Sequence, residues 1–186
     1  MRGVRVSVPR LVPYAAAIAF FKLKRGWVLE VMARQKERFK DVKAASPDEV
    51  DELRRKAKAT LPSRLSQLAA RYGFTYNRVA IKHNSTNWGS CSSRNNINLN
   101  LNIVRLPVVL QDYILLHELC HLRHHDHGHA FHLLLEHLLT DNLMKLLADP
   151  DVDSQTKDIA RKSAVSKARF PIDYTMSRAI KEYKLV

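Results

Sequence analysis

The 186-residue sequence has few cysteines and no long apolar run, and each shortage excludes a class of protein. The only cysteines are Cys91 and Cys120, too few for the disulfide framework of a small secreted domain. No stretch reaches the roughly 18 apolar residues that a membrane-spanning helix needs. Internal repeats and low-complexity tracts are also missing. At this length a chain can bury a core, so we expect one globular domain with an appended segment.

Acidic residues are scarce as well, since 18 Asp and Glu stand against 31 Lys and Arg, a net charge of +13. The excess is uneven: residues 1–40 contain ten basic residues and two acidic ones. Such an excess favours acidic partners, with DNA or another polyanion as one candidate, or else forms a solvated basic surface.

The apolar segment LVPYAAAIAFF at 11–21 follows three arginines, as in a signal peptide. KLKR follows it, however, where a signal peptide would have small residues for cleavage. The preceding Val4–Val8 has the pattern of a strand. We therefore expect a cytoplasmic protein that does not associate with a membrane.

Periodicity and capping residues predict a chain that mixes helices with a few strands. Strands are expected within 74–81 and 96–101. Helices are expected at 14–38 (as two helices joined near Gly26), from Ser46 to Gly73 with an interruption at Pro62, after Pro107, from about 128 to 142, and at 172–183. A linker at Ala148–Asp151 predicts a catalytic domain at 1–149 and a helical extension at 150–186.

Seven of the nine histidines lie within HELCHLRHHDHGHAFH, residues 117–132. His117 and His121 are four residues apart in an apolar helical pattern, so both imidazoles can point at one ion. Glu118 lies about 100° round the helix, beside such an ion rather than bound to it. Burying these groups without a metal or partners would be costly. The frame is apolar, whereas a metal-storage patch would be a mobile polar segment.

A catalytic zinc ion needs a third protein ligand. One helix cannot supply it, because eight residues of helix rise about 12 Å and a Zn–N bond is only about 2.0–2.1 Å long. The chain must therefore turn back, and Asp126 and Gly128 supply the break, with Asp126 as the expected cap of the next helix. His127 is the best candidate for the third ligand, followed by His129 and then Glu136.

Two linked blocks resemble those of the YgjP-like zinc metallopeptidases, small relatives of the SprT-like and WLM proteases. The first block is Trp88-Gly89-Ser90-Cys91-Ser92 together with NINLN at 96–100. The second is HELCHL together with His127 and Phe131, spaced as H-x-x-x-F. The similarity extends over roughly residues 4–140.

The resemblance implies that His117, His121 and His127 bind one Zn²⁺ per chain and that Glu118 is the catalytic acid/base. It also implies an α+β, zincin-like fold, in which the HExxH helix lies beside a short, mostly antiparallel sheet with flanking helices. The expected reaction is hydrolysis of a protein or peptide substrate. Glu118 would take a proton from the attacking water and return it to the leaving amine.

Other residues are candidates for binding the substrate. Asn96, Asn98 and Asn100 share one face of a predicted strand, and an extended peptide could pair with a sheet edge there. The same alternation would also arise from a strand with one solvent face and one core face. His129 is a candidate substrate contact, and His124, His125 and His129 are candidates for stabilising the oxyanion.

A second hypothesis belongs to a different class of protein. The chain could be a catalytically weak, zinc-containing module that binds nucleic acid through its basic surface. Hydrolysis requires Glu118, whereas a binding role does not, so this residue separates the two hypotheses.

Overall fold

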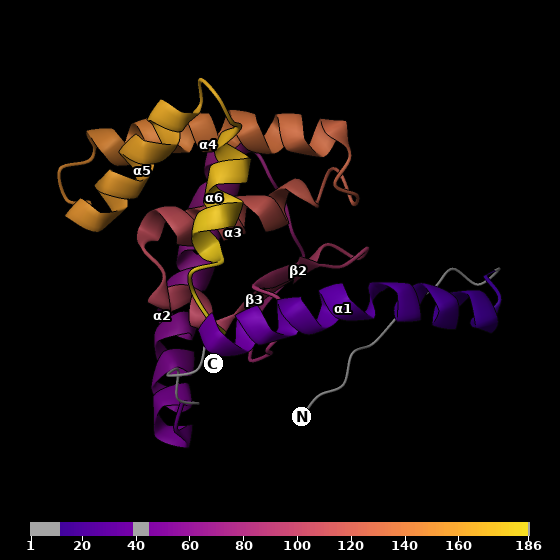
Figure 1. Ribbon diagram of the computed structural model, residues 1–186. Helices are drawn as coiled ribbons and strands as arrows, with labels where there is room; N and C mark the ends of the chain where they lie inside the picture. The colour runs from indigo at the N-terminus through magenta and orange to yellow at the C-terminus, as the bar shows by residue number, and fades with distance from the viewer. Residues whose placement is uncertain (1–11, 39–44, 186) are drawn as a thin grey trace. The chain divides into compact units, whose positions relative to one another are not determined.

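A computed structural model describes residues 12–38 and 45–185 of the chain. The chain divides into two compact units, Met1–Lys43 and Ala44–Val186. The described part of the first unit is one helix, α1 (Tyr14–Arg38) (Figure 1). The strand expected at Val4–Val8 lies outside the described residues.

The second unit begins with α2 (Pro47–Tyr72), whose two ends confirm the signals in the sequence. At the start, the Ser46 hydroxyl accepts a hydrogen bond from Glu49 N, and the Glu49 carboxylate accepts one from Ser46 N. This reciprocal pair is a capping box. At the end, Gly73 has φ 67°, a left-handed conformation that glycine adopts without a steric penalty.

Two expected interruptions of helices are absent. Helix α1 continues through Gly26, because one glycine costs a helix only about 1 kcal/mol relative to alanine. Helix α2 continues through Pro62, whose neighbours Leu61 and Leu65 are fully buried. Packing of such buried neighbours offsets the hydrogen bond that proline cannot donate.

The strands β1 (Arg78–Lys82), β2 (Gly89–Cys91) and β3 (Asn96–Asn100) form one mixed sheet. Strand β3 is central, parallel to β1 and antiparallel to β2. The α+β class is confirmed, but the sheet is not mostly antiparallel. The connection between β1 and β3 is long enough for a crossover, and β2 lies within it.

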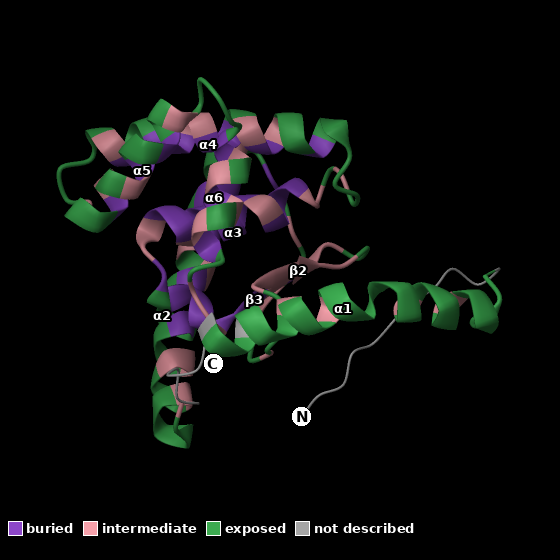
Figure 2. Ribbon diagram, viewed as in Figure 1, coloured by how far each residue is buried: buried purple, intermediate pink, exposed green. Residues whose placement is uncertain are grey.

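The short 3-10 helix η1 (Leu101–Arg105) connects the sheet to α3 (Val108–Cys120), which begins after Pro107 as expected. The next helix is α4 (His129–Ala148). The inner faces of α2, α3 and α4 are buried (Figure 2). Their apolar side chains form one core with those of β3 and η1.

A buried carboxylate connects three of these helices. Asp112 on α3 is fully buried and accepts two hydrogen bonds from Arg64 on α2, at 2.8 and 2.6 Å. It accepts a third from the Asn142 amide on α4, at 2.9 Å. Because every oxygen has a donor, the charge is compensated inside the core.

The chain ends in α5 (Ser154–Ser166) and α6 (Ile172–Ile180), which both contact α3 and α4. The expected amphipathic pattern of the last helix is confirmed, since Ile172, Met176 and Ile180 are buried. The segment after Asp149 contains both of these helices. That the catalytic domain ends at Asp149 stays a prediction.

None of the described helices is both long enough and apolar enough to cross a bilayer.

Replacing Asp112 by alanine is expected to destabilise the fold by about 3–5 kcal/mol, because the Arg64 charge then loses its partner. Urea denaturation measures the loss. Asp158→Ala is the control, since its carboxylate is 64% exposed and pairs with Arg161 at the surface. That variant should lose less than about 1 kcal/mol. Equal losses in the two variants would contradict a structural role for the buried carboxylate.

Candidate metal centre

The first two histidines of the site lie at the end of α3. His117 is in the last turn of the helix, and His121 occupies its C-cap position. Their rings lie on one face, with centroids 5.0 Å apart, as the four-residue spacing predicts. Neighbouring side chains such as Leu116 and Leu119 are fully buried, so the two histidines are only half-exposed.

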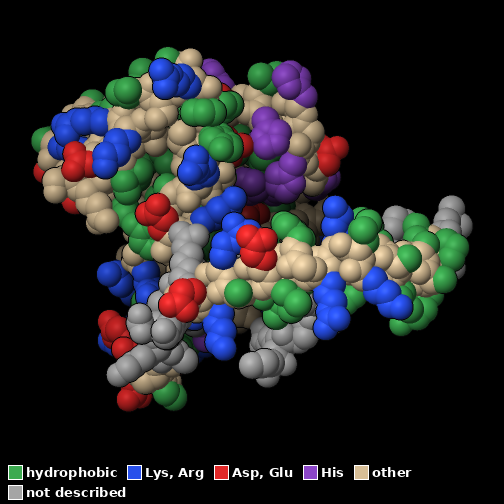
Figure 3. All heavy atoms as spheres, viewed as in Figure 1, with side chains coloured by type: hydrophobic (Ala, Val, Ile, Leu, Met, Phe, Trp, Pro, Cys, Tyr) green, Lys and Arg blue, Asp and Glu red, His purple; other side chains and the backbone are tan. Residues whose placement is uncertain are grey.

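The chain then reverses between α3 and α4, as helix geometry predicts. The Asp126 carboxylate accepts a hydrogen bond from Gly128 N at 3.1 Å within this turn. Gly128, rather than Asp126, is the N-cap of α4, so the expected cap was two residues too early. The reversal brings His127 Nε2 to 3.1 Å from His117 Nε2. Histidine side chains accordingly gather on one face of the second unit (Figure 3).

Phe131, in the first turn of α4, packs against all three imidazoles. Its ring centroid lies 4.9 Å from that of His117, 4.7 Å from that of His121 and 4.8 Å from that of His127. The phenyl ring is fully buried. It therefore limits the directions in which the three rings can turn.

The three imidazoles fit a metal ion. One ring nitrogen from each lies within 4.8 Å of the others. Nitrogens on a tetrahedral zinc ion would be about 3.3 Å apart, for Zn–N bonds of about 2.0–2.1 Å. The His121 Nδ1 lies 3.0 Å from the His124 carbonyl oxygen, which leaves Nε2 of that ring for an ion. His117 Nδ1 is buried and has no partner among the described residues.

The protonation state of the site also suits a cation. Burial, followed by the charges of His121 and His127, lowers the pKa of His117 to about 4. Burial also lowers the pKa of His121. Both rings are therefore neutral at pH 7, which is the form of histidine that binds a metal.

Glu118 follows His117 on α3, and its side chain lies against strand β2. A Cβ atom on Gly89 of β2 would lie 2.5 Å from Glu118 Oε1, so the carboxylate occupies the space that glycine leaves open. Burial raises the pKa of Glu118 to about 8. Its Oε2 atom is buried and has no partner within the part of the chain that the structure describes. A buried carboxyl with a free oxygen is suited to exchanging a proton.

The other ligand candidates lie elsewhere. Among the described residues, the group of metal-ligating side chains contains neither His129 nor Glu136. His129 begins α4 and borders a pocket beside the cluster. The Glu136 carboxylate accepts hydrogen bonds from the backbone N–H groups of Ile172 and Asp173 at the start of α6.

The asparagines of β3 have different surroundings. Asn96 is half-exposed, and the Asn98 amide donates to the Ser90 hydroxyl at 3.2 Å. Asn100 is buried, and its amide donates to the carbonyl oxygens of Asn84 and Asn87, which shapes that loop. Both edges of β3 are paired, so the edge strand that contacts α3 is β2. A role for these asparagines in substrate binding stays a prediction.

Two features of the site were missed in the sequence. The Asp173 carboxylate lies 2.8 Å from His132 Nδ1, although the two residues are 41 positions apart. No local pattern connects them, so sequence alone had no signal for this pair. The close approach of Gly89 to Glu118 was also missed, although the glycine itself belongs to the quoted Trp-Gly block.

The chain is similar to known proteins in sequence and in structure. One solved structure that aligns is the metallopeptidase zymogen of Pyrococcus abyssi abylysin, over 50% of this chain and 98% of its own, at 18% identity and a TM-score of 0.39. No curated protein matches the chain. The family model of the YgjP-like metallopeptidase domain matches residues 44–145, more than half of the chain. The chain therefore belongs to the YgjP-like family and contains its metallopeptidase domain.

Proposed function

We propose that the protein is a zinc metallopeptidase that cleaves peptide bonds in protein substrates. His117, His121 and His127 would bind one zinc ion per chain, and Glu118 would act as general acid/base. The observation that carries the proposal is the convergence of three ring nitrogens within 4.8 Å, next to a buried carboxyl with a free oxygen. The family match supports the activity, since its model describes a metallopeptidase domain.

A zinc ion in this site would supply Lewis acidity, polarising the scissile carbonyl and lowering the pKa of water to about 7. The protein supplies the remaining chemistry. Glu118 takes the proton of the attacking water and delivers it to the leaving amine. Phe131 and the His124 carbonyl hold the imidazoles in place, so they need no reorganisation during the reaction.

The substrate would lie along β2. This strand contacts α3 and pairs with β3 on one side only, within the sheet that the structure describes. An extended peptide could therefore pair with its other edge, which starts at Gly89 beside Glu118. Asn98 would contribute indirectly, through its hydrogen bond to Ser90 on β2.

His127→Ala is expected to remove most of the bound zinc, because two imidazoles alone leave the ion without its third protein ligand. Metal analysis of the purified variant measures this. His125→Ala is the matched control, since His125 is exposed in the same turn. Unchanged zinc content in the His127 variant would overturn the ligand assignment and promote His129.

Glu118→Gln is expected to lower peptidase activity by about 10²–10⁴, the usual effect of losing a positioned acid/base group. Zinc content should not change, because glutamine has nearly the same shape. Cleavage of an unfolded protein and metal analysis are measured on one preparation. Glu52→Gln, at an exposed position of α2, should retain full activity.

The same experiment separates the second hypothesis. Equal cleavage by the wild type and Glu118→Gln would contradict the mechanism. If neither cleaves but both retain zinc and bind single-stranded DNA, the chain is a nucleic-acid-binding module, consistent with its net charge of +13.

Gly89→Ala is expected to retain zinc but lose activity, because the added methyl group displaces the Glu118 carboxylate. Displacing a catalytic group by about 1 Å can lower the rate roughly a hundredfold. Activity and metal content are measured together. Gly26→Ala is the control, since a Cβ there meets no atom within 4 Å. Full activity of Gly89→Ala would show that the position of Glu118 does not depend on this glycine.

A further inference from the structure

A pocket of about 520 Å³ lies between α4 and the start of α6. Its wall is mostly apolar and includes Leu133, Pro171 and Tyr174, while His132 and Asp173 contribute polar groups. Leu133 is 58% exposed and Tyr174 is 44% exposed. The volume is within the range of about 300–1,000 Å³ that is usual for ligand sites.

This pocket adjoins the three imidazoles through His132. The His132 ring centroid lies 6.4 Å from that of His127 and 5.5 Å from that of Phe131. His129 borders the same pocket. A peptide whose backbone crosses the imidazoles can therefore place a neighbouring side chain between α4 and α6.

Asp173 connects this pocket to Tyr113, a neighbour of His117. Its carboxylate accepts a hydrogen bond from the Tyr113 hydroxyl at 2.9 Å and contacts His132 Nδ1 at 2.8 Å. The Tyr113 ring centroid lies 6.1 Å from that of His117. Only 16% of the Asp173 side chain is exposed, so these contacts are largely shielded from water.

The wall that α6 provides is held in place. Glu136 on α4 accepts hydrogen bonds from Ile172 N and Asp173 N, at 3.1 and 3.2 Å. A carboxylate in this position also interacts favourably with the positive end of the helix dipole. Ile172 and Met176, on the inner face of α6, are buried. The pocket is therefore preformed, which reduces the entropy cost of binding.

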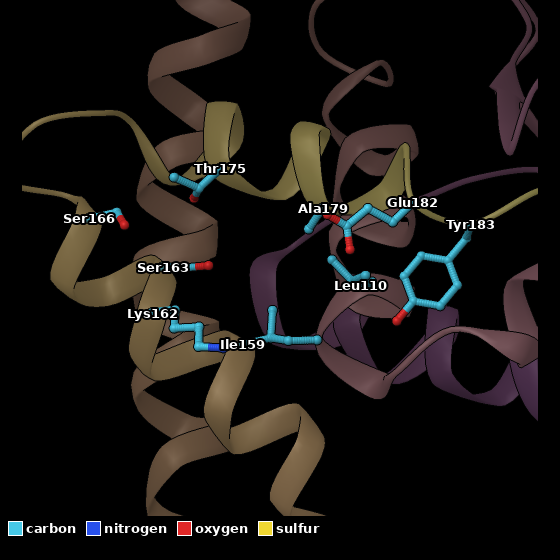
Figure 4. A pocket seen from close by; sticks show the side chains of 9 residues that line it. All are labelled: Leu110, Ile159, Lys162, Ser163, Ser166, Thr175, Ala179, Glu182 and Tyr183. Atoms are coloured by element: carbon cyan, nitrogen blue, oxygen red, sulfur yellow. The ribbon is translucent and has the colours of Figure 1, made fainter. Parts of the chain in front are cut away.

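The other face of α6 borders a different cavity, of about 280 Å³, lined by residues such as Leu110, Lys162 and Tyr183 (Figure 4). No histidine lines that cavity. It offers a position for a matched control on the same helix.

We propose that the pocket between α4 and α6 receives a large apolar side chain of the substrate, from a residue next to the scissile bond. This inference rests on the proposed peptidase function. An acidic side chain would be disfavoured, because the Glu136 and Asp173 carboxylates also line the pocket. Helix α6 lies beyond residues 44–145, so the extension would contribute specificity that the matched domain lacks.

Ser177→Phe tests the proposal by filling the pocket, which Ser177 lines. Ala179→Phe is the matched control, because it places the same side chain in the cavity on the other face of α6. Substrates are peptides of one sequence with Gly, Ala, Leu, Phe or Asp beside the scissile bond. The wild type should prefer Leu and Phe. Ser177→Phe should lower kcat/KM for these by about tenfold or more and change that for Ala little, since apolar pockets discriminate by roughly 10–200-fold.

A second readout does not depend on catalysis. Short Gly-Ser peptides with one central Leu, Phe, Ala or Asp are labelled, and their binding to the Glu118→Gln protein is followed by fluorescence anisotropy. The Leu and Phe peptides should bind more tightly than the others. Ser177→Phe in this background should remove the difference, and Ala179→Phe should retain it. Thermal melting checks that both variants fold.

The two readouts distinguish the pocket from the peptidase function. If the wild type cleaves and Ser177→Phe keeps the same preference for Leu and Phe, the pocket proposal is overturned and the function stands. If no peptide is cleaved but Ser177→Phe removes selective binding of Leu and Phe, the function fails and the pocket is supported. Absence of any preference for Leu and Phe in both readouts would also overturn the pocket.

Discussion

The histidine cluster depends on one geometric constraint: a straight helix can bring only two imidazoles, four residues apart, to one point. A third must come from a chain that has turned back. The turn at 121–128 meets this constraint, and Phe131, placed early in α4, packs against all three rings. The reversal is possible only where α3 and α4 are held together, so the cluster depends on the core beneath them.

Contacts in the core also fix the position of α3 relative to the other helices and the sheet. Asp112 connects α2, α3 and α4 through Arg64 and Asn142, so the helix that carries the histidines is fixed at its opposite end. The sheet approaches the same helix through Gly89, where the missing side chain leaves room for the Glu118 carboxylate. A carboxyl enclosed in this way loses hydration, which is why its pKa rises to about 8.

Much of the local structure could be predicted, because it depends on neighbours in the chain. Ser46 and Gly73 mark the ends of α2 through short-range hydrogen bonds and backbone conformation. Both predicted interruptions were wrong. Helix α1 continues through Gly26, because one glycine weakens a helix only slightly, and α2 continues through Pro62, because packing outweighed the local preference. The sheet is mixed for a similar reason, since its strand order depends on how the connection from β1 to β3 folds.

The sequence by itself determined the two imidazoles on one helix face, the neighbouring carboxylate and the need for a reversal, because each follows from the fixed geometry of a helix. Only the tertiary structure decided which residues meet across the site. Gly89 lies against Glu118, and Asp173 lies between His132 and Tyr113. The residues in these pairs are 29 to 60 positions apart in the chain, and Tyr113 and Asp173 are the most distant pair. Such pairs result from the packing of whole helices and strands, and no periodicity within either segment specifies its partner.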